Sequence, residues 1–313
     1  PSTATYIGQN GFSGCNSLIS IVIPSSVTTI KRNAFNFCSS LKSIIIPPSV
    51  TSIDVYCFFS CFNLENVSLP TSLTELKDAT FYRCPKMKQI TIPSSIVSIG
   101  NDVFYDCSSL TEITIPSSVI SIGNKSFYQC TSLVNVFIPS TLALIGSHAF
   151  VGCKSLQKVE FSSSENNETN NSNSFTRKQR IENSAFYKCS SLVSVSIPLV
   201  MKIVGKCSFM ECDSLTEITI PPSVEQICSQ SFYKCKSLKK VAVNSSIVEI
   251  NKSAFNECSS LTEFTFDTNT VIKSIEKAAF SRCTSLTEFA FPASVQSINS
   301  NVFNGCVSLK KIT

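Results

Sequence analysis

The composition of this 313-residue chain excludes several classes of protein before any motif is considered. It contains one histidine and no tryptophan, and its net charge is only +5, with one dense basic run at 177–180. Nucleic-acid-binding proteins gather Lys and Arg on one face, and a transmembrane helix needs about 20 apolar residues in a row. Because neither feature is present, we expect no nucleic-acid partner and no membrane insertion.

The chain repeats a pattern of about 23 residues that is marked by cysteine. Thirteen cysteines follow one another at intervals of 23 residues, except for one interval of 36 and one of 25. These ladder cysteines are Cys15, Cys38, Cys61, Cys84, Cys107, Cys130, Cys153, Cys189, Cys212, Cys235, Cys258, Cys283 and Cys306. A Phe lies three residues before each of them, and a Leu lies three residues after each, with Met87 as the one substitute. A period kept in this way indicates stacked repeats.

In chain order, each repeat predicts two extended segments and a turn, as the second repeat illustrates. The alternation Ile-x-Ile at 21–23 has the period of a half-buried strand. Pro24 ends this strand, since proline has no amide hydrogen for a ladder. The stretch 27–30 is too short for a helix and is expected to be extended, while Ala-Phe-x-x-Cys at 34–38 predicts one helical or 3₁₀ turn. One repeat cannot bury its apolar side alone, so thirteen repeats are expected to stack into a single solenoid over 1–313.

The pattern Leu-x-x-Ile-x-Ile-Pro-x-x-Val-x-x-Ile-x-x-x-Ala-Phe-x-x-Cys resembles the BspA-like, or treponemal, class of leucine-rich repeat. The resemblance covers the chain apart from one insertion. It implies a leucine-rich-repeat solenoid, a β-rich α/β horseshoe with a parallel sheet on its concave face. Proteins of this class are often surface or secreted proteins of mucosal bacteria and parasitic protists, and several are associated with adhesion to host cells and to matrix glycoproteins such as fibronectin.

The register is interrupted at two places. Thirteen extra residues fall between Cys153 and Cys189, in the polar stretch 162–180. Nothing there can bury enough apolar surface to offset the entropy of ordering, so we expect a mobile loop, either a tolerated insertion or a docking or cleavage segment. A two-residue insertion near 267–273 predicts a longer turn. Both ends of the chain fall inside a repeat without a polar capping unit, which leads us to expect a fragment of a longer protein.

The cysteines are expected to be free thiols. Equivalent side chains on stacked strands are about 4.8 Å apart, whereas the Cβ atoms of a disulfide prefer ~3.8 Å. We therefore interpret the ladder cysteines as buried small hydrophobes. Three of the sixteen cysteines (Cys57, Cys207 and Cys228) are out of register, and a bridge between Cys207 and Cys228 remains an alternative. No Cys-x-x-Cys pair occurs, so no metal is expected.

The first candidate binding surface is the outward side of the strand in each repeat, which the resemblance makes the concave face. Residues five and seven after the ladder cysteines point outward there. The candidate residues are Val22, Ile45, Thr91, Glu112, Thr114, Phe137, Lys158, Glu160, Glu217, Thr219, Lys240, Glu263 and Thr265. Two interpretations remain open: these residues reflect β-propensity alone, or they form a shallow protein-binding face.

The second candidate is an aromatic ladder formed by the residue that follows the core Phe. Its members are Phe59, Tyr82, Tyr105, Tyr128, Tyr187 and Tyr233, of which the first four come from consecutive repeats. Tyrosine suits interfaces because it combines an apolar ring with a polar tip. Partial burial against the next repeat and a binding hot spot both fit the pattern.

Catalytic features are lacking in the sequence. His148 is the single histidine, the nine glycines form no phosphate-cradling loop, and the carboxylates are spread among Lys residues. We therefore expect no enzyme and no cofactor. The prediction is a non-catalytic protein-binding or adhesion module at the cell surface or outside the cell, with host or matrix proteins as partners. The alternatives are an intracellular (cytoplasmic) or secreted interaction scaffold and a ligand-sensing receptor ectodomain.

Overall fold

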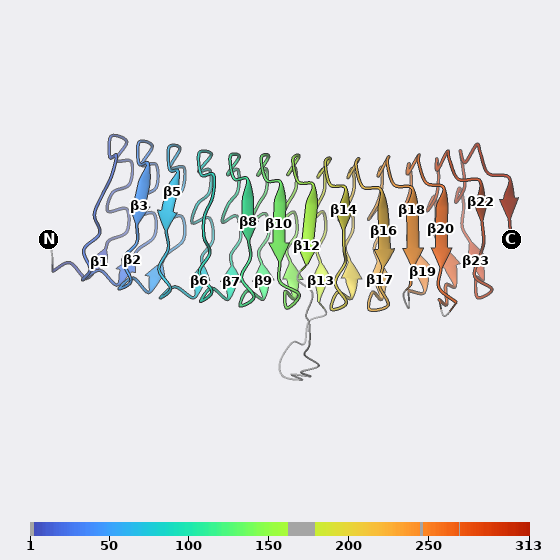
Figure 1. Cartoon of the computed structure of the whole chain (residues 1–313), viewed down its shortest axis with the longest axis horizontal. Coiled ribbons are helices and arrows are strands. Elements are labelled where there is room, and N and C mark those ends of the chain that lie inside the picture. Colours follow the sequence, from blue (N-terminus) through green and yellow to red (C-terminus); the bar gives the residue numbers. More distant parts are fainter. Residues whose placement is uncertain (1–2, 162–178, 245–246, 269) are drawn as a thin grey trace. The chain divides into compact units, whose positions relative to one another are not determined.

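The computed structural model describes residues 3–161, 179–244, 247–268 and 270–313 (Figure 1). Two compact units divide the chain, unit 1 at Pro1–Leu156 and unit 2 at Gln157–Thr313. The insertion predicted at 162–180 lies outside the described residues apart from its last two positions. Arg180 begins a strand instead of ending a loop, because the next residue, Ile181, is fully buried and already occupies a core position of the following repeat.

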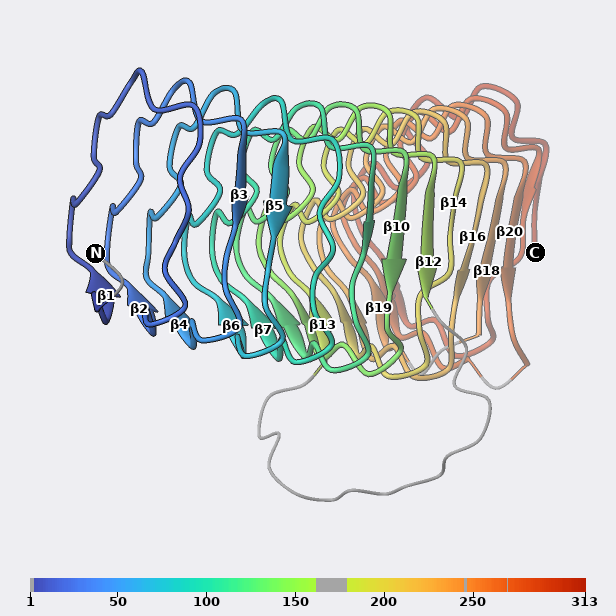
Figure 2. The same ribbon diagram turned by 60° about the vertical axis from the view of Figure 1, so that its left-hand side comes forward.

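Two columns of short strands form unit 1. The first column comes from the Ile-x-Ile segments and contains β3 (Ser43–Ile45), β5 (Asn66–Ser68), β8 (Glu112–Thr114) and β10 (Asn135–Ile138). The second column comes from the Val-x-x-Ile segments and contains β1 (Tyr6–Ile7), β2 (Thr29–Ile30), β4 (Ser52–Ile53), β6 (Glu75–Leu76), β7 (Ser98–Ile99), β9 (Ser121–Ile122) and β11 (Leu144–Ile145). Figure 2 shows the two columns on different sides of unit 1.

Unit 2 has the same two columns. The first column contains β12 (Lys158–Phe161), β14 (Ser194–Val195), β16 (Glu217–Ile220), β18 (Lys240–Val243), β20 (Glu263–Phe266), β22 (Glu288–Phe289) and β24 (Lys311–Ile312). The second column contains β13 (Arg180–Ile181), β15 (Ile203–Val204), β17 (Gln226–Ile227), β19 (Glu249–Ile250), β21 (Ser274–Ile275) and β23 (Ser297–Ile298).

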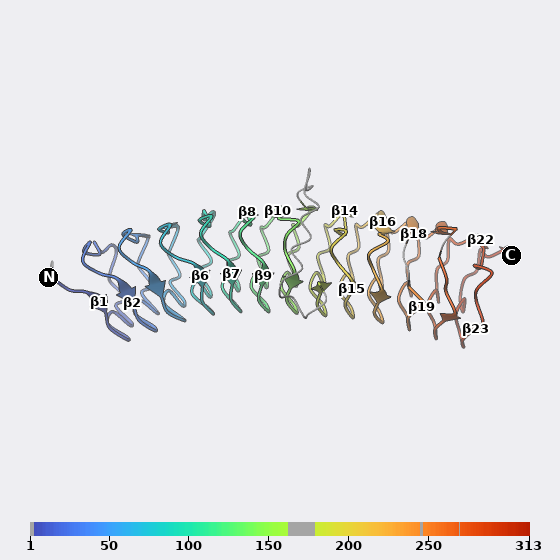
Figure 3. The same ribbon diagram turned by 90° about the horizontal axis from the view of Figure 1, so that it is seen from below.

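Strand pairing within each unit is parallel and pairs equivalent positions of successive repeats. Ser121 of β9 pairs with Ser98 of β7, and Lys240 of β18 pairs with Glu217 of β16. Figure 3 shows β6, β7 and β9 following one another along unit 1. This register keeps the alternation of the first column intact, so that one set of side chains faces the core and the other faces outward. The predicted parallel-strand repeat solenoid is confirmed within each unit.

The side of each repeat that was expected to form one helical or 3₁₀ turn is a series of tight turns, and no helix occurs among the described residues. The amide of Phe35 donates to the carbonyl of Cys57 in the next repeat (N···O 2.9 Å), and the amide of Phe37 donates to Phe59 (2.8 Å). Asn33 and Phe37 both have φ of 57°. A helix would direct these amides to its own carbonyls. Here alternate amides reach the neighbouring repeat, and these bonds offset the cost of left-handed backbone at residues with side chains.

The core is a row of phenylalanine rings in each unit. In unit 1 the rings of Phe12 and Phe35 are stacked with centroids 5.2 Å apart, and the row continues to Phe150. In unit 2 an equivalent row runs from Phe186 to Phe303. The ladder leucines and isoleucines surround these rows, so that each repeat buries its apolar side against its neighbours, as predicted for a solenoid.

Candidate functional site

A hollow lies on the outward side of the first column of unit 1. It measures about 700 Å³ and spans four successive repeats, from β3 to β8. We call it the strand-face hollow. Of the predicted face, it contains Ile45, Thr91, Glu112 and Thr114. Its other lining residues are Ser43, Ile44, Asn66, Val67, Ser68, Gln89, Ile90, Ile92, Ser94, Ile113 and Pro116.

The side chains around this hollow change in character along the column. At its start Ile45 is 73% exposed, and Val22 in the preceding repeat is 91% exposed. Ile45 pairs with Ser68, and on the far side Thr114 pairs with Phe137, which is 41% exposed. Apolar side chains therefore flank a stretch of hydroxyl and amide groups. Such a surface can bury apolar anchors and still satisfy the polar groups of a bound polypeptide chain.

The first column is interrupted where the hollow lies. β3 pairs with β5 and β8 pairs with β10, but the segment 88–92 between β5 and β8 is not a strand. The sequence predicted a strand there, because Ile90 and Ile92 alternate in the same way as in the other repeats. Both isoleucines are buried as predicted, and Gln89 and Thr91 face outward. Burial thus follows the sequence pattern, while backbone pairing does not.

The predicted face residues of unit 2 contact one another. Lys240 forms an ion pair with Glu263 (Nζ···Oε2 3.1 Å), and Lys158 pairs with Glu160 on the same strand. Glu217 lies opposite Lys240 in the ladder, and Thr219, Ala242 and Thr265 lie in register beside them. Exposed ion pairs are worth only ~0–1 kcal/mol. This part of the face has the character of a solvated surface.

A second hollow, of about 530 Å³, includes Thr265 and lies beside the longer turn of unit 2. Phe264, Phe266 and Phe291 contribute to its lining. Their rings pack against Phe289: the centroid of Phe289 is 5.8 Å from that of Phe264 and 5.1 Å from that of Phe291. This aromatic cluster belongs to the core packing of the last repeats.

The aromatic ladder forms a continuous stack in unit 1 only. The ring of Phe59 stacks on Tyr82 (centroids 4.7 Å apart), Tyr82 stacks on Tyr105 (4.5 Å), and Tyr105 stacks on Tyr128 (4.7 Å). All four are half-buried. Because each ring covers the face of the next, the surface is left with ring edges and hydroxyl groups. Packing between repeats, one of the two interpretations above, accounts for this arrangement.

The two ladder tyrosines of unit 2 do not meet. Met210 occupies the position between Tyr187 and Tyr233 in the intervening repeat. The Nζ of Lys188 lies 5.0 Å from the ring centroid of Tyr187, and the Tyr233 hydroxyl bonds to Glu257 (2.9 Å). Each of these two tyrosines is therefore contacted by a charged side chain and not by another ladder tyrosine.

The ladder cysteines take part in a hydrogen-bond pattern that sequence reasoning missed. The thiol of Cys84 donates to the carbonyl of Phe58 (Sγ···O 3.2 Å), and the thiol of Cys107 donates to that of Phe81 (3.2 Å). Burial raises the pKa of the Cys107 thiol from 9.0 to about 12. A thiolate is the reactive form of cysteine, so these groups act as structural donors rather than nucleophiles. The sequence signal for these bonds was that cysteine occupies the ladder position in every repeat, because packing alone would also accept other small apolar residues.

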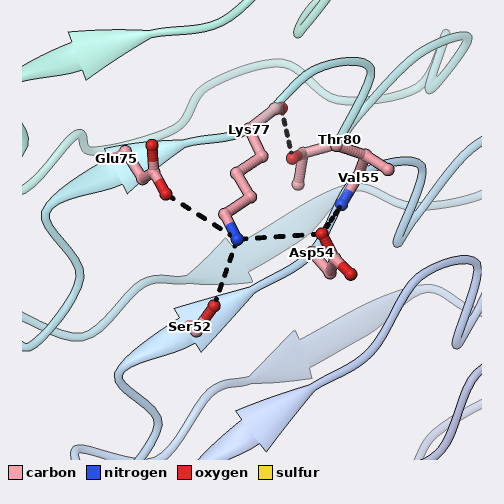
Figure 4. Close-up of polar contacts among 6 residues, drawn as sticks. All are labelled: Ser52, Asp54, Val55, Glu75, Lys77 and Thr80. Atoms are coloured by element: carbon pink, nitrogen blue, oxygen red, sulfur yellow. Dashed lines mark hydrogen bonds and ion pairs between the residues drawn. The ribbon is translucent and has the colours of Figure 1, made fainter.

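A polar cluster on the second column of unit 1 surrounds Lys77 (Figure 4). Its Nζ lies 3.7 Å from Asp54 and 3.7 Å from Glu75, and it is 3.5 Å from the hydroxyl of Ser52. The cluster joins β4 to β6, which are not paired in a ladder. Lys77 has two carboxylate partners, so the cluster has the arrangement of a structural ion pair.

The described residues contain no group of three or more His, Cys, Asp or Glu side chains placed to hold a metal ion. The described part of the chain contains no helix that is long and apolar enough to span a bilayer.

Comparison with known proteins agrees with the repeat pattern. The family model for the BspA type leucine rich repeat region matches residues 1–111, 97–183 and 179–310. No curated protein matches the sequence.

Two solved structures are similar to the whole chain. A leucine-rich repeat protein from Bacteroides ovatus is 27% identical, with a TM-score of 0.66, and the match covers 95% of this chain and 87% of that one. A leucine rich cell surface protein from Faecalibacterium prausnitzii is 28% identical, with a TM-score of 0.56 and coverage of 98% and 82%. The chain belongs to the BspA-type leucine-rich repeat family.

Proposed function

We propose that this chain is a non-catalytic protein-binding module that uses the strand-face hollow of unit 1 as its binding surface. The observation that carries the proposal is the exposure of Ile45 at 73% beside a hollow of about 700 Å³. Large apolar side chains exposed beside a polar surface are typical of protein interaction sites. In unit 2 the equivalent surface carries one ion pair between neighbouring strands and one within a strand, which favours unit 1.

The shape of the surface supports an extended polypeptide as the bound element. The hollow crosses four repeats, and strands in a sheet are about 4.8 Å apart, so its length is roughly 15 Å. Hydrogen-bonding groups along this path are offered by Ser43, Asn66 and Gln89. Glu112 is the one acidic residue that lines the hollow. A partner segment with an apolar side chain near Ile45 and a basic side chain near Glu112 would complement it.

The finer part of the proposal is attachment to host cells or matrix proteins, with fibronectin as the first partner to test. Membership in the family supports it, as does the similarity to a protein that is named a cell surface protein. The proposed location of the chain is accordingly the cell surface or the extracellular space.

The experiment measures binding of immobilised chain to fibronectin by surface plasmon resonance, with serum albumin as the negative control. Ile45→Asp and Thr114→Lys are compared with Val97→Asp, since Val97 is also an exposed aliphatic residue of unit 1 (43%) but does not line the hollow. We expect the first two variants to weaken binding about tenfold or more, which is ~1.4 kcal/mol, and the third to bind as the parent does.

The outcomes separate the two parts of the proposal. Equal binding by all three variants would place the interface elsewhere. If the parent chain does not bind fibronectin, that partner is excluded, and capture of surface-labelled host proteins that is lost in Ile45→Asp but kept in Val97→Asp would still support the hollow. Circular dichroism melting of each variant shows that any loss is not caused by unfolding.

A further inference from the structure

Three tyrosines of unit 1 are packed more closely than the phenylalanines of the same repeats. We call Tyr82, Tyr105 and Tyr128 the tyrosine stack. Tyr82 and Tyr105 have ring centroids 4.5 Å apart and planes inclined by 12°, whereas the core pair Phe81 and Phe104, one residue earlier in each repeat, is separated by 5.6 Å. Tyr105 and Tyr128 are 4.7 Å apart and inclined by 7°.

The phenol groups of Tyr82 and Tyr128 both lie close enough to Tyr105 to act on it electrostatically. Burial and then the neighbouring phenols of Tyr82 and Tyr128 raise the pKa of Tyr105. In two nearly parallel rings stacked with their hydroxyls near each other, the ring carbons next to the C–O bonds lie close to each other across the stack. These are the carbon atoms at which phenoxyl radicals combine.

The tyrosine stack can be reached from solvent, and the residues at its two ends in the same column are not tyrosines. All three rings are half-buried, with edges exposed along one flank of the unit. On one side the stack ends at Phe59, which has no hydroxyl, and on the other side the equivalent position of the next repeat is Val151. The phenols stacked directly on a radical formed at one of these tyrosines are therefore those of the stack itself.

We propose that the tyrosine stack is a site of oxidative cross-linking, in which Tyr105 forms an intrachain dityrosine with Tyr82 or Tyr128. The oxidant is hydrogen peroxide consumed by a haem peroxidase. Each of two phenols loses one proton and one electron, and the two radicals form a carbon–carbon bond between the ring carbons beside the hydroxyls. The hydrogens on those carbons then move to the oxygens and restore both phenols, while one peroxide molecule is reduced to two water molecules.

Proximity favours this product over links between molecules. Two groups held in contact react as if each were at very high concentration. The rings are on the surface and can rotate about their side-chain bonds, which allows the two carbons to approach. The bond would join two neighbouring repeats covalently, independently of any partner at the strand-face hollow.

The test treats dilute chain with a haem peroxidase and hydrogen peroxide, isolates the monomer and digests it with trypsin. The three tyrosines fall in different tryptic peptides, 78–83, 89–125 and 126–154. We expect peptide 89–125 joined to one of the other two, lighter by two hydrogen atoms than their sum, with the fluorescence of dityrosine.

Matched variants decide the assignment. Tyr105→Phe keeps the stacked ring but removes the central phenol, and it should abolish the cross-linked peptides in the monomer. Tyr233→Phe removes a phenol that has no tyrosine neighbour in its column and should leave their yield unchanged. The proposal fails if the oxidised monomer lacks a link between these peptides, or if the link persists in Tyr105→Phe.

Discussion

The thiol of Cys61 donates a hydrogen bond to the backbone carbonyl of Phe35 in the preceding repeat, with an Sγ···O distance of 3.1 Å. Both side chains are fully buried. The same bond recurs from repeat to repeat, for example from Cys130 to Phe104 (3.2 Å) and from Cys235 to Phe209 (3.1 Å). A small apolar residue without a donor would leave each of these buried carbonyls without this bond.

Replacement of one ladder cysteine should therefore destabilise the chain. We expect Cys84→Ala to lower the free energy of unfolding by about 2 kcal/mol, through a lost donor and a small cavity. Cys84→Val fills the space without a donor and should cost about 1 kcal/mol. Urea denaturation measures both.

The control for these variants is Cys207→Ala, at a half-exposed cysteine outside the ladder, which should change stability by less than about 0.5 kcal/mol. If Cys84→Val is as stable as the parent, the thiol hydrogen bond contributes nothing and the cysteine acts through volume alone.

Thiol reactivity should divide the sixteen cysteines into two groups. Twelve are buried, and four are half-exposed, namely Cys15, Cys207, Cys228 and Cys306. Titration of the folded chain with Ellman's reagent should show a fast phase from the half-exposed group and a much slower phase from the rest. In denaturant without reductant, nearly all sixteen should react. A denatured count near zero would contradict the free-thiol prediction.

Stability should fall in alkaline solution. Burial raises the pKa values of Cys107 and Cys258 from 9.0 to about 12. The unfolded chain releases these protons at a lower pH than the folded chain does, so ionisation of the thiols favours unfolding. The contribution of the two protonated thiols to the free energy of unfolding is therefore fully present below pH 9.0 and is lost as the pH rises from there to about 12.

Urea midpoints measured across this range should decline for the parent, and they should decline less steeply for a Cys107→Ala, Cys258→Ala double variant. Equal slopes in the two proteins would show that other groups, such as lysines, cause the alkaline loss.

A glycine corner in unit 1 should be intolerant of any side chain. A Cβ at Gly123 would lie 2.5 Å from the carbonyl carbon of Gly100, which is backbone and cannot move aside. We expect Gly123→Ala to lower the free energy of unfolding by about 2 kcal/mol or more. At Gly8 the nearest atom to an added Cβ is 4.0 Å away. Gly8→Ala should therefore be nearly neutral. Thermal melting measures both variants, and similar losses of stability at both sites would argue against the close contact.

The tyrosine stack should contribute to stability through its rings rather than its hydroxyls. Tyr105→Ser removes two stacked contacts, each worth ~0.5–1.5 kcal/mol, so we expect a loss of about 2 kcal/mol. Tyr105→Phe should stay within about 1 kcal/mol of the parent. Tyr187→Ser is the matched control and should cost less, since the described residues include no ring stacked on Tyr187. Binding measured on the same variants tests the other interpretation, because a hot spot would lose affinity without a change in melting.

The repeat period was sufficient to predict the core. A chain that stacks equivalent residues must bury the same positions in every repeat, so Phe35, Phe58 and Phe81 could be placed in one row from spacing alone. Their rings are stacked as expected. The outward side of the first column could be predicted in the same way, because alternation determines which side chain leaves the core. Ile45 and Thr91 are exposed for this reason.

Only the tertiary structure decided how neighbouring repeats bond to each other. The stretch Ala34–Cys38 was expected to form one helical or 3₁₀ turn, but the amides of Phe35 and Phe37 reach the next repeat, and a single repeat contains no information about that partner. The thiol bonds of the ladder and the break in strand pairing at 88–92 have the same origin. Residue spacing specifies which side chains coincide in the stack, whereas hydrogen-bond directions and hollows depend on how two backbones lie against each other in three dimensions.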